Sequence, residues 1–261
     1  LDARLLLQFA SECSANALIA DPDVVLEEAQ WTRFQSLVQR RAGGEPLAYL
    51  VGEAGFYGAL LAVTPDVLVP RPETEELVDW ALDVLCDQPA PSIADLGTGS
   101  GAIALTLARA RPDARVMAVD VSLAALSVAQ LNQQRLGCAN VALIHASWYD
   151  GWQAADGLDL IISNPPYIHA DDPHLSGDGV RFEPRLALTD EADGLDAYRA
   201  IAAGAVARLK PGGWLLVEHG HDQGAAVASL WLQAGLVDVR GRLDLSGNPR
   251  MTGGQKPARS A

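Results

Sequence analysis

The distribution of apolar and polar positions divides the chain into three regions. Residues 1–50 carry apolar side chains at helical spacing, which predicts a small N-terminal helical domain. Residues 51–69 change to short β-prone runs broken by turn residues, which predicts a β-hairpin linker. In residues 70–261, short apolar runs alternate with longer helical stretches, a pattern typical of α/β domains.

The third region contains five short apolar runs bounded by turn residues, as expected for strands buried on both faces of a parallel sheet. These runs lie at residues 93–96, 116–120, 141–144, 158–163 and 214–218. Helices are predicted at residues 73–85, 102–110, 123–136, 196–209 and 224–234, with residues 211–213 ending the fourth. The alternation predicts a doubly wound, mostly parallel α/β sheet.

Two segments do not follow this alternation. Residues 168–196 fit no helix or strand and hold eight acidic side chains against two arginines. Long loops in compact domains are usually functional, so we predict that this one contacts substrate. Residues 253–255, with the sequence Gly-Gly-Gln, are interpreted as part of a flexible C-terminal tail.

Composition narrows the class of protein. Of the 261 residues, 49% are hydrophobic, which is enough to build a core and excludes a disordered chain. The net charge of −14 argues against a direct nucleic-acid substrate, because phosphate contacts need clustered Lys and Arg. No stretch approaches the roughly 20 apolar residues that span a bilayer, and the opening residues lack the basic flank of a signal peptide. We therefore expect no membrane association.

Cysteine and histidine usage predicts neither disulfides nor a metal site. Cys13, Cys86 and Cys138 are odd in number and far apart, which favours a reducing cytoplasmic location. His219 and His221 have no carboxylate or thiol spaced to complete a metal site, so we expect a structural turn there.

A glycine-rich loop follows the first predicted strand and opens a helix. It consists of Gly97, Thr98, Gly99, Ser100 and Gly101. Glycines allow a sharp turn and close approach of a ligand, and the helix N-terminus adds N–H donors. Asp120 ends the second strand, where its carboxylate can accept both hydroxyls of a ribose. The spacing indicates an adenosine-containing cofactor without distinguishing a nicotinamide dinucleotide from other candidates.

A second motif, Asn164-Pro165-Pro166-Tyr167, follows the fourth predicted strand and should face the same crevice. The Asn164 side-chain oxygen and the Pro165 carbonyl can each accept one N–H of a planar amide or amine. Two such acceptors fix the nitrogen and aim its lone pair at an electrophile. Pro165 and Pro166 stiffen the turn, and Tyr167 offers a flat face to the substrate. Alkylation acidifies an amide nitrogen, so we expect no general base.

Together these motifs resemble those of class I S-adenosylmethionine-dependent methyltransferases, which have a Rossmann-like seven-stranded sheet. More narrowly, the chain is similar to the HemK-type glutamine methyltransferases, which modify the GGQ glutamine of peptide chain release factors. The resemblance extends over nearly the whole chain. It includes residues 44–46, 69–75, 172–174, 180–184 and 218–220.

The resemblance implies that the helical domain docks the release factor and that the enzyme modulates translation termination. It also implies that residues 97–101 hold the methionine part of S-adenosylmethionine, whose product is S-adenosylhomocysteine. Asp120 would hold the ribose, and Trp148 would lie along the adenine. Residues 164–167 would bind the substrate glutamine, with Asn164 also bordering the cofactor. Ser147 stands where many relatives carry Asp, so an adenine contact from that carboxylate is weakened or lost.

Three other functions remain open from the sequence. The first is an adenine methyltransferase acting on DNA or RNA, because an exocyclic amine needs the same two acceptors as an amide. The net charge of −14 argues against this function. A nicotinamide-dependent oxidoreductase explains the glycine loop and leaves residues 164–167 without a role. An inactive adaptor would need neither motif. Arg71 and Glu73 either brace the catalytic turn or form an ordinary ion pair.

Overall fold

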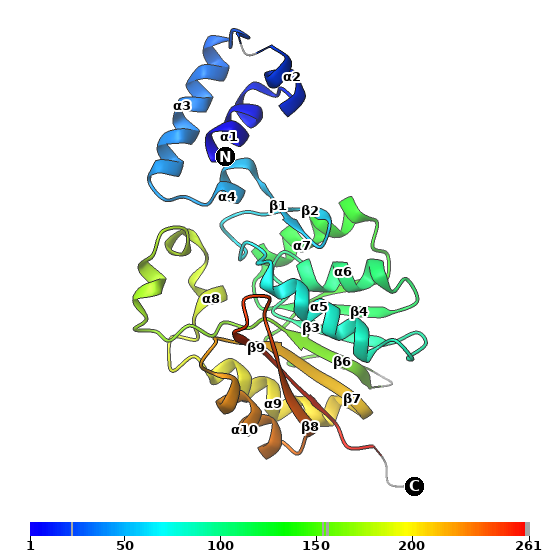
Figure 1. Cartoon of the computed structure of the whole chain (residues 1–261). Coiled ribbons are helices and arrows are strands. Elements are labelled where there is room, and N and C mark those ends of the chain that lie inside the picture. Colours follow the sequence, from blue (N-terminus) through cyan, green and yellow to red (C-terminus); the bar gives the residue numbers. More distant parts are fainter. Residues whose placement is uncertain (22, 153, 155–156, 259–261) are drawn as a thin grey trace.

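The N-terminal part of the computed structural model, which describes residues 1–21, 23–152, 154 and 157–258, is a helical lobe followed by a hairpin. The helices are α1 (Asp2–Ser11), α2 (Ala15–Ala20), α3 (Glu28–Ala42) and α4 (Leu47–Val51), and the hairpin pairs β1 (Glu53–Phe56) with β2 (Ala59–Ala62). Leu6, Leu37 and Leu50 form a core of the lobe's own. Figure 1 shows the lobe at one end of the molecule, with the hairpin between it and the main domain.

The main domain is built on a seven-stranded sheet with the order β5-β4-β3-β6-β7-β9-β8. The strands are β3 (Ser92–Leu96), β4 (Arg115–Asp120), β5 (Val141–His145), β6 (Leu158–Ser163), β7 (Leu209–Glu218), β8 (Val237–Leu243) and β9 (Pro249–Gln255). Strands β3 to β7 pair in parallel, whereas β9 is antiparallel to both β7 and β8. The chain reverses its direction of winding between β3 and β6. Ligands of doubly wound sheets bind at the strand carboxyl ends of such a switch point.

Helices cover both faces of this sheet (Figure 1). One layer contains α5 (Glu73–Val84), α6 (Ala102–Ala110) and α7 (Leu123–Leu136), and the other contains α9 (Asp196–Arg208) and α10 (Gly224–Gln233). Trp80 of α5 is fully buried in the first layer, and Tyr198 of α9 and Trp231 of α10 are fully buried in the second. The mostly parallel seven-stranded sheet predicted from the sequence is confirmed. Among the described helices, none combines the length and apolar character needed to cross a bilayer.

Three local predictions are wrong. The helix predicted to reach residue 209 ends at Arg208, and residues 211–213 belong to β7 instead of a turn. Residues 168–196 contain three short helices, η1 (Pro173–Ser176), η2 (Val180–Phe182) and α8 (Arg185–Leu188). Residues 253–255 lie inside β9, between two paired strands, and so do not form a flexible tail.

Glycines in β9 allow two tryptophans from opposite layers to pack onto the sheet. A Cβ atom at Gly253 would lie 2.6 Å from Leu216 Cδ2 and 2.7 Å from the Trp80 ring. A Cβ atom at Gly254 would lie 2.9 Å from Cδ1 of Trp231. All three distances are shorter than van der Waals contact. The Gly-Gly sequence is therefore explained by core packing.

We expect Gly253→Ala to destabilise the main domain, because the added methyl group overpacks the core around Trp80. Overpacking of this kind costs roughly 1–3 kcal/mol of the free energy of unfolding. Urea denaturation followed by circular dichroism measures the loss. Gly55→Ala in β1 is the control, since no heavy atom of the described residues lies within 4 Å of a Cβ there. Equal midpoints for the two variants would contradict this explanation.

Candidate active site

The glycine loop joins β3 to α6 at the carboxyl edge of the sheet. Gly97, Gly99 and Gly101 have φ angles of 73°, 55° and 84°, in the left-handed region that glycine adopts without strain. The N–H groups of Gly97 and Thr98 both donate to the Val119 carbonyl at 2.9 Å. Much of the loop's donor capacity is therefore used to fix its own shape. Gly101 caps α6 and lies against Leu105.

A buried carboxyl group, Asp95 at the end of β3, stabilises the loop through hydrogen bonds. Its Oδ2 accepts hydrogen bonds from Thr98 Oγ1 at 2.7 Å and from the Ala104 N–H at 3.2 Å. Burial raises the pKa of Asp95 to about 7, although these two hydrogen bonds oppose the shift. Its Oδ1 has no hydrogen-bond partner among the described residues. Asp95 therefore couples the end of β3 to the first turn of α6.

Asp120 lies beside the loop because β4 pairs with β3 in parallel, with Leu96 opposite Val119. Its Oδ2 accepts the Gly99 N–H at 2.8 Å, and its Oδ1 accepts the Ser122 N–H at 2.8 Å. Burial raises its pKa against these hydrogen bonds. Each carboxylate oxygen still has a lone pair to offer a ligand. Asp120 can thus hold the loop and accept ligand hydroxyls at the same time.

The turn at residues 164–167 follows β6, across the switch point from the glycine loop. Asn164 and Pro166 line the same cavity as the loop, whereas Pro165 is buried. Tyr167 packs against the core on the α9 and α10 side, and burial raises its pKa to about 12. A phenol with that pKa stays protonated at neutral pH. Asn164 is the member of the turn whose polar side chain borders the cavity.

Two further residues form a hydrogen-bonded chain that begins at the Asn164 side chain. Its Nδ2 donates to Thr74 Oγ1 at 3.1 Å, and Thr74 Oγ1 donates to Glu218 Oε2 at 2.7 Å. Glu218 follows Val217, which pairs with Ser163, so parallel pairing brings Glu218 beside Asn164. Burial raises the pKa of Glu218 to about 7. Neither Thr74 nor Glu218 is predicted from the sequence to belong to the site, although both lie within the motifs at 69–75 and 218–220.

Arg71 does not brace the turn directly. Its Nη2 forms an ion pair of 2.5 Å with Glu183 Oε2, a carboxylate that is only 1% exposed. Glu183 belongs to the 168–196 segment, so this pair fastens that segment beside the start of α5. The residue of this motif that reaches the turn is Thr74.

The adenine side of the predicted site follows β5. Ala146, Ser147 and Trp148 line the cavity, and Trp148 has a φ of 49°. The carbonyl of Trp148 accepts the Trp152 Nε1–H at 2.8 Å, which fixes this turn. Trp148 therefore borders the cavity from a turn of fixed shape.

These elements enclose one cavity of about 320 Å³, within the range of small-molecule sites. The predicted site residues that line it are Gly97, Thr98, Gly99, Ser100, Asp120, Trp148, Asn164 and Pro166. The other predicted site residues, Gly101, Pro165 and Tyr167, adjoin lining residues in the sequence but do not line the cavity themselves. Phe56 of the hairpin and Leu186 of α8 are also among the lining residues, so the hairpin and the 168–196 segment both border the cavity.

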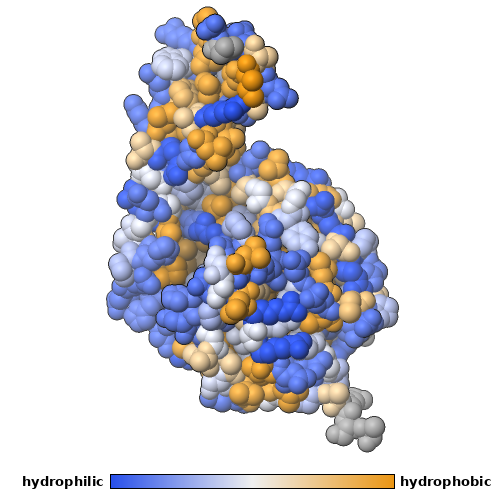
Figure 2. Space-filling view, viewed as in Figure 1, coloured by the Kyte–Doolittle hydropathy of each residue, from blue (hydrophilic) through white to orange (hydrophobic). Residues whose placement is uncertain are grey.

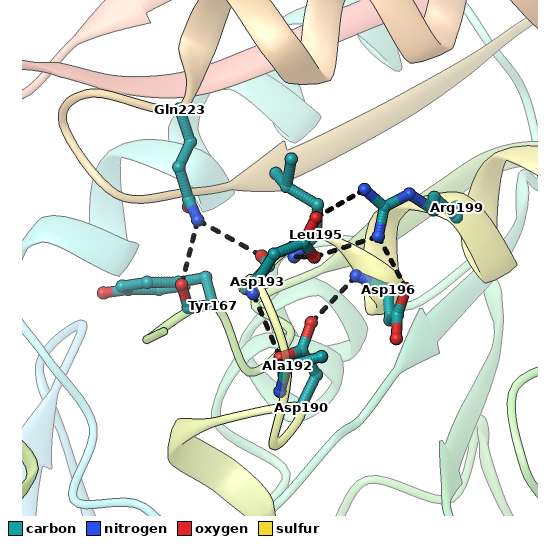
Figure 3. A network of polar contacts seen from close by, with 9 residues as sticks. Tyr167, Asp190, Ala192, Asp193, Leu195, Asp196, Arg199 and Gln223 are labelled. Carbon is teal, nitrogen blue, oxygen red and sulfur yellow. Dashed lines mark hydrogen bonds and ion pairs between the residues drawn. The ribbon is translucent and has the colours of Figure 1, made fainter. Parts of the chain in front are cut away.

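The segment after Tyr167 is held by a polar network (Figure 3). Gln223 Nε2 donates to the carbonyls of Tyr167 at 2.9 Å and of Gly194 at 3.2 Å. The Asp190 carboxylate accepts the N–H groups of Ala192, Gly194 and Asp196. Arg199 pairs with Asp193 and Asp196, each at 2.6 Å. Much of this segment's acidity thus serves internal hydrogen bonds.

The histidine pair after β7 is part of a turn. The Nε2 atom of His219 lies 2.9 Å from Thr252 Oγ1, and its Nδ1 lies 2.8 Å from the Gly220 carbonyl oxygen. Both ring nitrogens are therefore engaged with the protein. Within residues 1–21, 23–152, 154 and 157–258, no group of three His, Cys, Asp or Glu side chains is placed to hold a metal ion.

Known proteins are similar to this chain over nearly its whole length. Residues 78–176 match the family model "Methyltransferase small domain", and residues 1–52 match "PrmC N-terminal domain". The chain is 50% identical to the release factor glutamine methyltransferase of Bordetella pertussis, over 97% of this chain and 94% of that protein. It is 48% identical to the protein of that name in Burkholderia pseudomallei, over 98% and 92%.

A solved structure shares the fold at lower identity. It is a 16S rRNA N2 G1207 methyltransferase of T. thermophilus in complex with AdoMet and guanosine, with a TM-score of 0.58 and 20% identity. The match covers 78% of this chain and 49% of that one. At this identity the similarity supports the sheet and its helical layers alone.

Proposed function

The chain belongs to the family of release factor glutamine methyltransferases, and on that premise we propose that it methylates the side-chain amide nitrogen of the GGQ glutamine in peptide chain release factors. One observation carries the proposal: Asn164 lines the same cavity as the glycine loop and Asp120. In this proposal Asn164 binds the substrate amide, and the glycine loop and Asp120 beside it bind the nucleoside of the methyl donor.

The cavity fits S-adenosylmethionine as the methyl donor. Asp120 has carboxylate lone pairs for ribose hydroxyls, and Trp148 offers a face for the adenine. Residues 97–100 provide a wall in which the backbone itself borders the ligand, and a Cβ added at Gly99 would meet no heavy atom of the described residues within 4 Å. The sulfonium of S-adenosylmethionine supplies an electrophilic methyl group and leaves as a neutral thioether.

The protein's own contribution is to orient the amide. The Asn164 oxygen and the Pro165 carbonyl accept the two N–H groups of the substrate amide. This fixes the amide plane and directs the nitrogen lone pair into the cavity. The nitrogen forms a bond to the methyl carbon as the carbon–sulfur bond breaks. The displaced electron pair stays on sulfur, and the nitrogen loses one proton to water.

Mass spectrometry of a release factor after incubation with the enzyme and S-adenosylmethionine tests this function. We expect a gain of one methyl group on the GGQ glutamine and none on a release factor with alanine at that position. DNA and RNA oligonucleotides in the same assay test the adenine alternative. If the enzyme binds S-adenosylmethionine and leaves the glutamine unmodified, the proposed substrate is wrong.

We propose that the N-terminal lobe docks the release factor. Figure 2 shows apolar side chains gathered over this lobe. An open groove between α1, α2 and α3 is lined by Leu7, Leu18, Asp21, Val24, Leu26, Trp31 and Phe34. Val25 beside it is 90% exposed. Exposed apolar grooves of this kind are typical of protein interaction sites. A cytoplasmic location, predicted from the three cysteines, would place the enzyme with this partner.

Trp31→Ala should weaken docking without changing chemistry. Large aromatic side chains often dominate interface energy, so we expect the KM for the release factor to rise about tenfold while kcat stays the same. Steady-state kinetics with intact release factor measures this. Val38→Ala, also exposed on α3 but outside the groove, is the control. A fall in kcat at unchanged KM would contradict a docking role.

A further inference from the structure

The amide of Asn164 can present either an acceptor or a donor to the cavity. The two ends of a carboxamide have nearly the same shape, so packing alone does not choose between them. Only the oxygen end can accept an N–H of the substrate amide. Reversal would turn the Nδ2 donors toward the substrate's own donors. Some other group must therefore set the orientation.

We propose that Glu218 and Thr74 are positioning residues that fix the Asn164 oxygen toward the substrate; this inference rests on the proposed function. An ionised carboxylate only accepts hydrogen bonds, so the Thr74 hydroxyl must donate to Glu218 at 2.7 Å. The Thr74 oxygen is then left to accept from Asn164 Nδ2 at 3.1 Å. With Nδ2 engaged by Thr74, the oxygen is the end of the amide left to accept an N–H of the substrate. The Glu218 carboxylate thus determines which group donates and which accepts along the chain to Thr74 and Asn164.

Burying the Glu218 carboxylate costs free energy, which argues against a purely structural role for this residue. Its side chain sits at the end of β7 and is 1% exposed, which opposes ionisation. The hydrogen bond from Thr74 favours the charged form, and Arg250 and the Asn164 side chain act in the same direction. The charged or titratable groups around it are Glu73 of α5, Tyr167 after β6, Tyr198 of α9 and Arg250 of β9. Perturbed buried carboxyls of this kind concentrate at functional sites.

The hydrogen-bonded chain from Glu218 through Thr74 to Asn164 predicts that kcat depends on pH. Because the pKa of Glu218 is raised to about 7, the carboxyl group takes up a proton as the pH falls through that value. A protonated carboxyl can donate as well as accept, so Thr74 is no longer forced to donate to it. Asn164 then loses its fixed orientation. We expect kcat to fall on the acid side of about pH 7.

The hydroxyl of Thr74 is tested by a matched pair of variants. Thr74→Val keeps the shape and removes the hydroxyl, and we expect kcat to fall about 10- to 100-fold with S-adenosylmethionine affinity unchanged. Thr74→Ser keeps the hydroxyl and should retain most of the activity. If the valine variant does not fold, Thr74→Ala, which removes both the hydroxyl and the methyl group, takes its place. Thermal melting and titration calorimetry with S-adenosylmethionine report on folding and cofactor binding.

The Glu218→Gln variant tests the charge. Glutamine can donate toward Thr74 at any pH, so we expect lower kcat at pH 8 and loss of the acid limb near pH 7. The inference is overturned if Thr74→Val is as active as wild type, if Thr74→Ser loses as much as Thr74→Val, or if Glu218→Gln keeps the acid limb. All three comparisons require an active wild-type enzyme. Absence of methyl transfer by wild type would instead reject the proposed function.

Discussion

Asn164→Ala should reduce methyl transfer to the release factor by about 1,000-fold. An amide nitrogen is a poor nucleophile because its lone pair is delocalised into the carbonyl. Alanine removes the side-chain acceptor that fixes one N–H of the substrate, and it leaves the Pro165 carbonyl alone. The nitrogen can then rotate away from the methyl group, which removes the advantage of a preorganised approach.

The loss should be confined to the chemical step. Asn164 is one residue of a larger cavity wall, so S-adenosylmethionine should bind Asn164→Ala with an affinity close to that of wild type. Single-turnover kinetics followed by mass spectrometry separates this from a binding defect. Asn248→Ala, in the exposed turn between β8 and β9, is the control. Near-normal turnover in Asn164→Ala would reject the proposed mechanism.

The parallel part of the sheet can be predicted because its strands are buried on both faces. Strand β6, for example, is buried at five of its six positions, which gives a mostly apolar run bounded by turn residues. The edge strands give a weaker signal. Strand β8 is half exposed or exposed throughout, and β9 contains a proline and two glycines that are uncommon in strands. Their pairing depends on contacts with β7 and Trp80 that local sequence does not encode.

The candidate site divides in the same way. The glycine loop, Asp120 and the turn at 164–167 can be predicted because each is a short motif at the end of a strand. The bond from Thr74 to Glu218 joins residues 144 positions apart. Neither residue type is distinctive by itself, and their meeting depends on the strand order and on where α5 begins. The short helices of the 168–196 segment could not be predicted, because its polar pattern lacks helical periodicity and acids such as Asp190 bond to local N–H groups instead.

Asp120→Ala should weaken S-adenosylmethionine binding by about 100-fold, because two contributions are lost together. The carboxylate is the proposed acceptor for the ribose hydroxyls, and hydrogen bonds to a charged group contribute roughly 1.5–3 kcal/mol each. It also accepts the Gly99 N–H at 2.8 Å, so its removal loosens the glycine loop. Titration calorimetry measures the affinity, and Asp113→Ala, in the loop before β4, is the control. Asp120→Asn should lose less, since its oxygen can still accept one hydrogen bond. Unchanged affinity in Asp120→Ala would exclude this carboxylate from the cofactor site and leave it only the role of holding the loop.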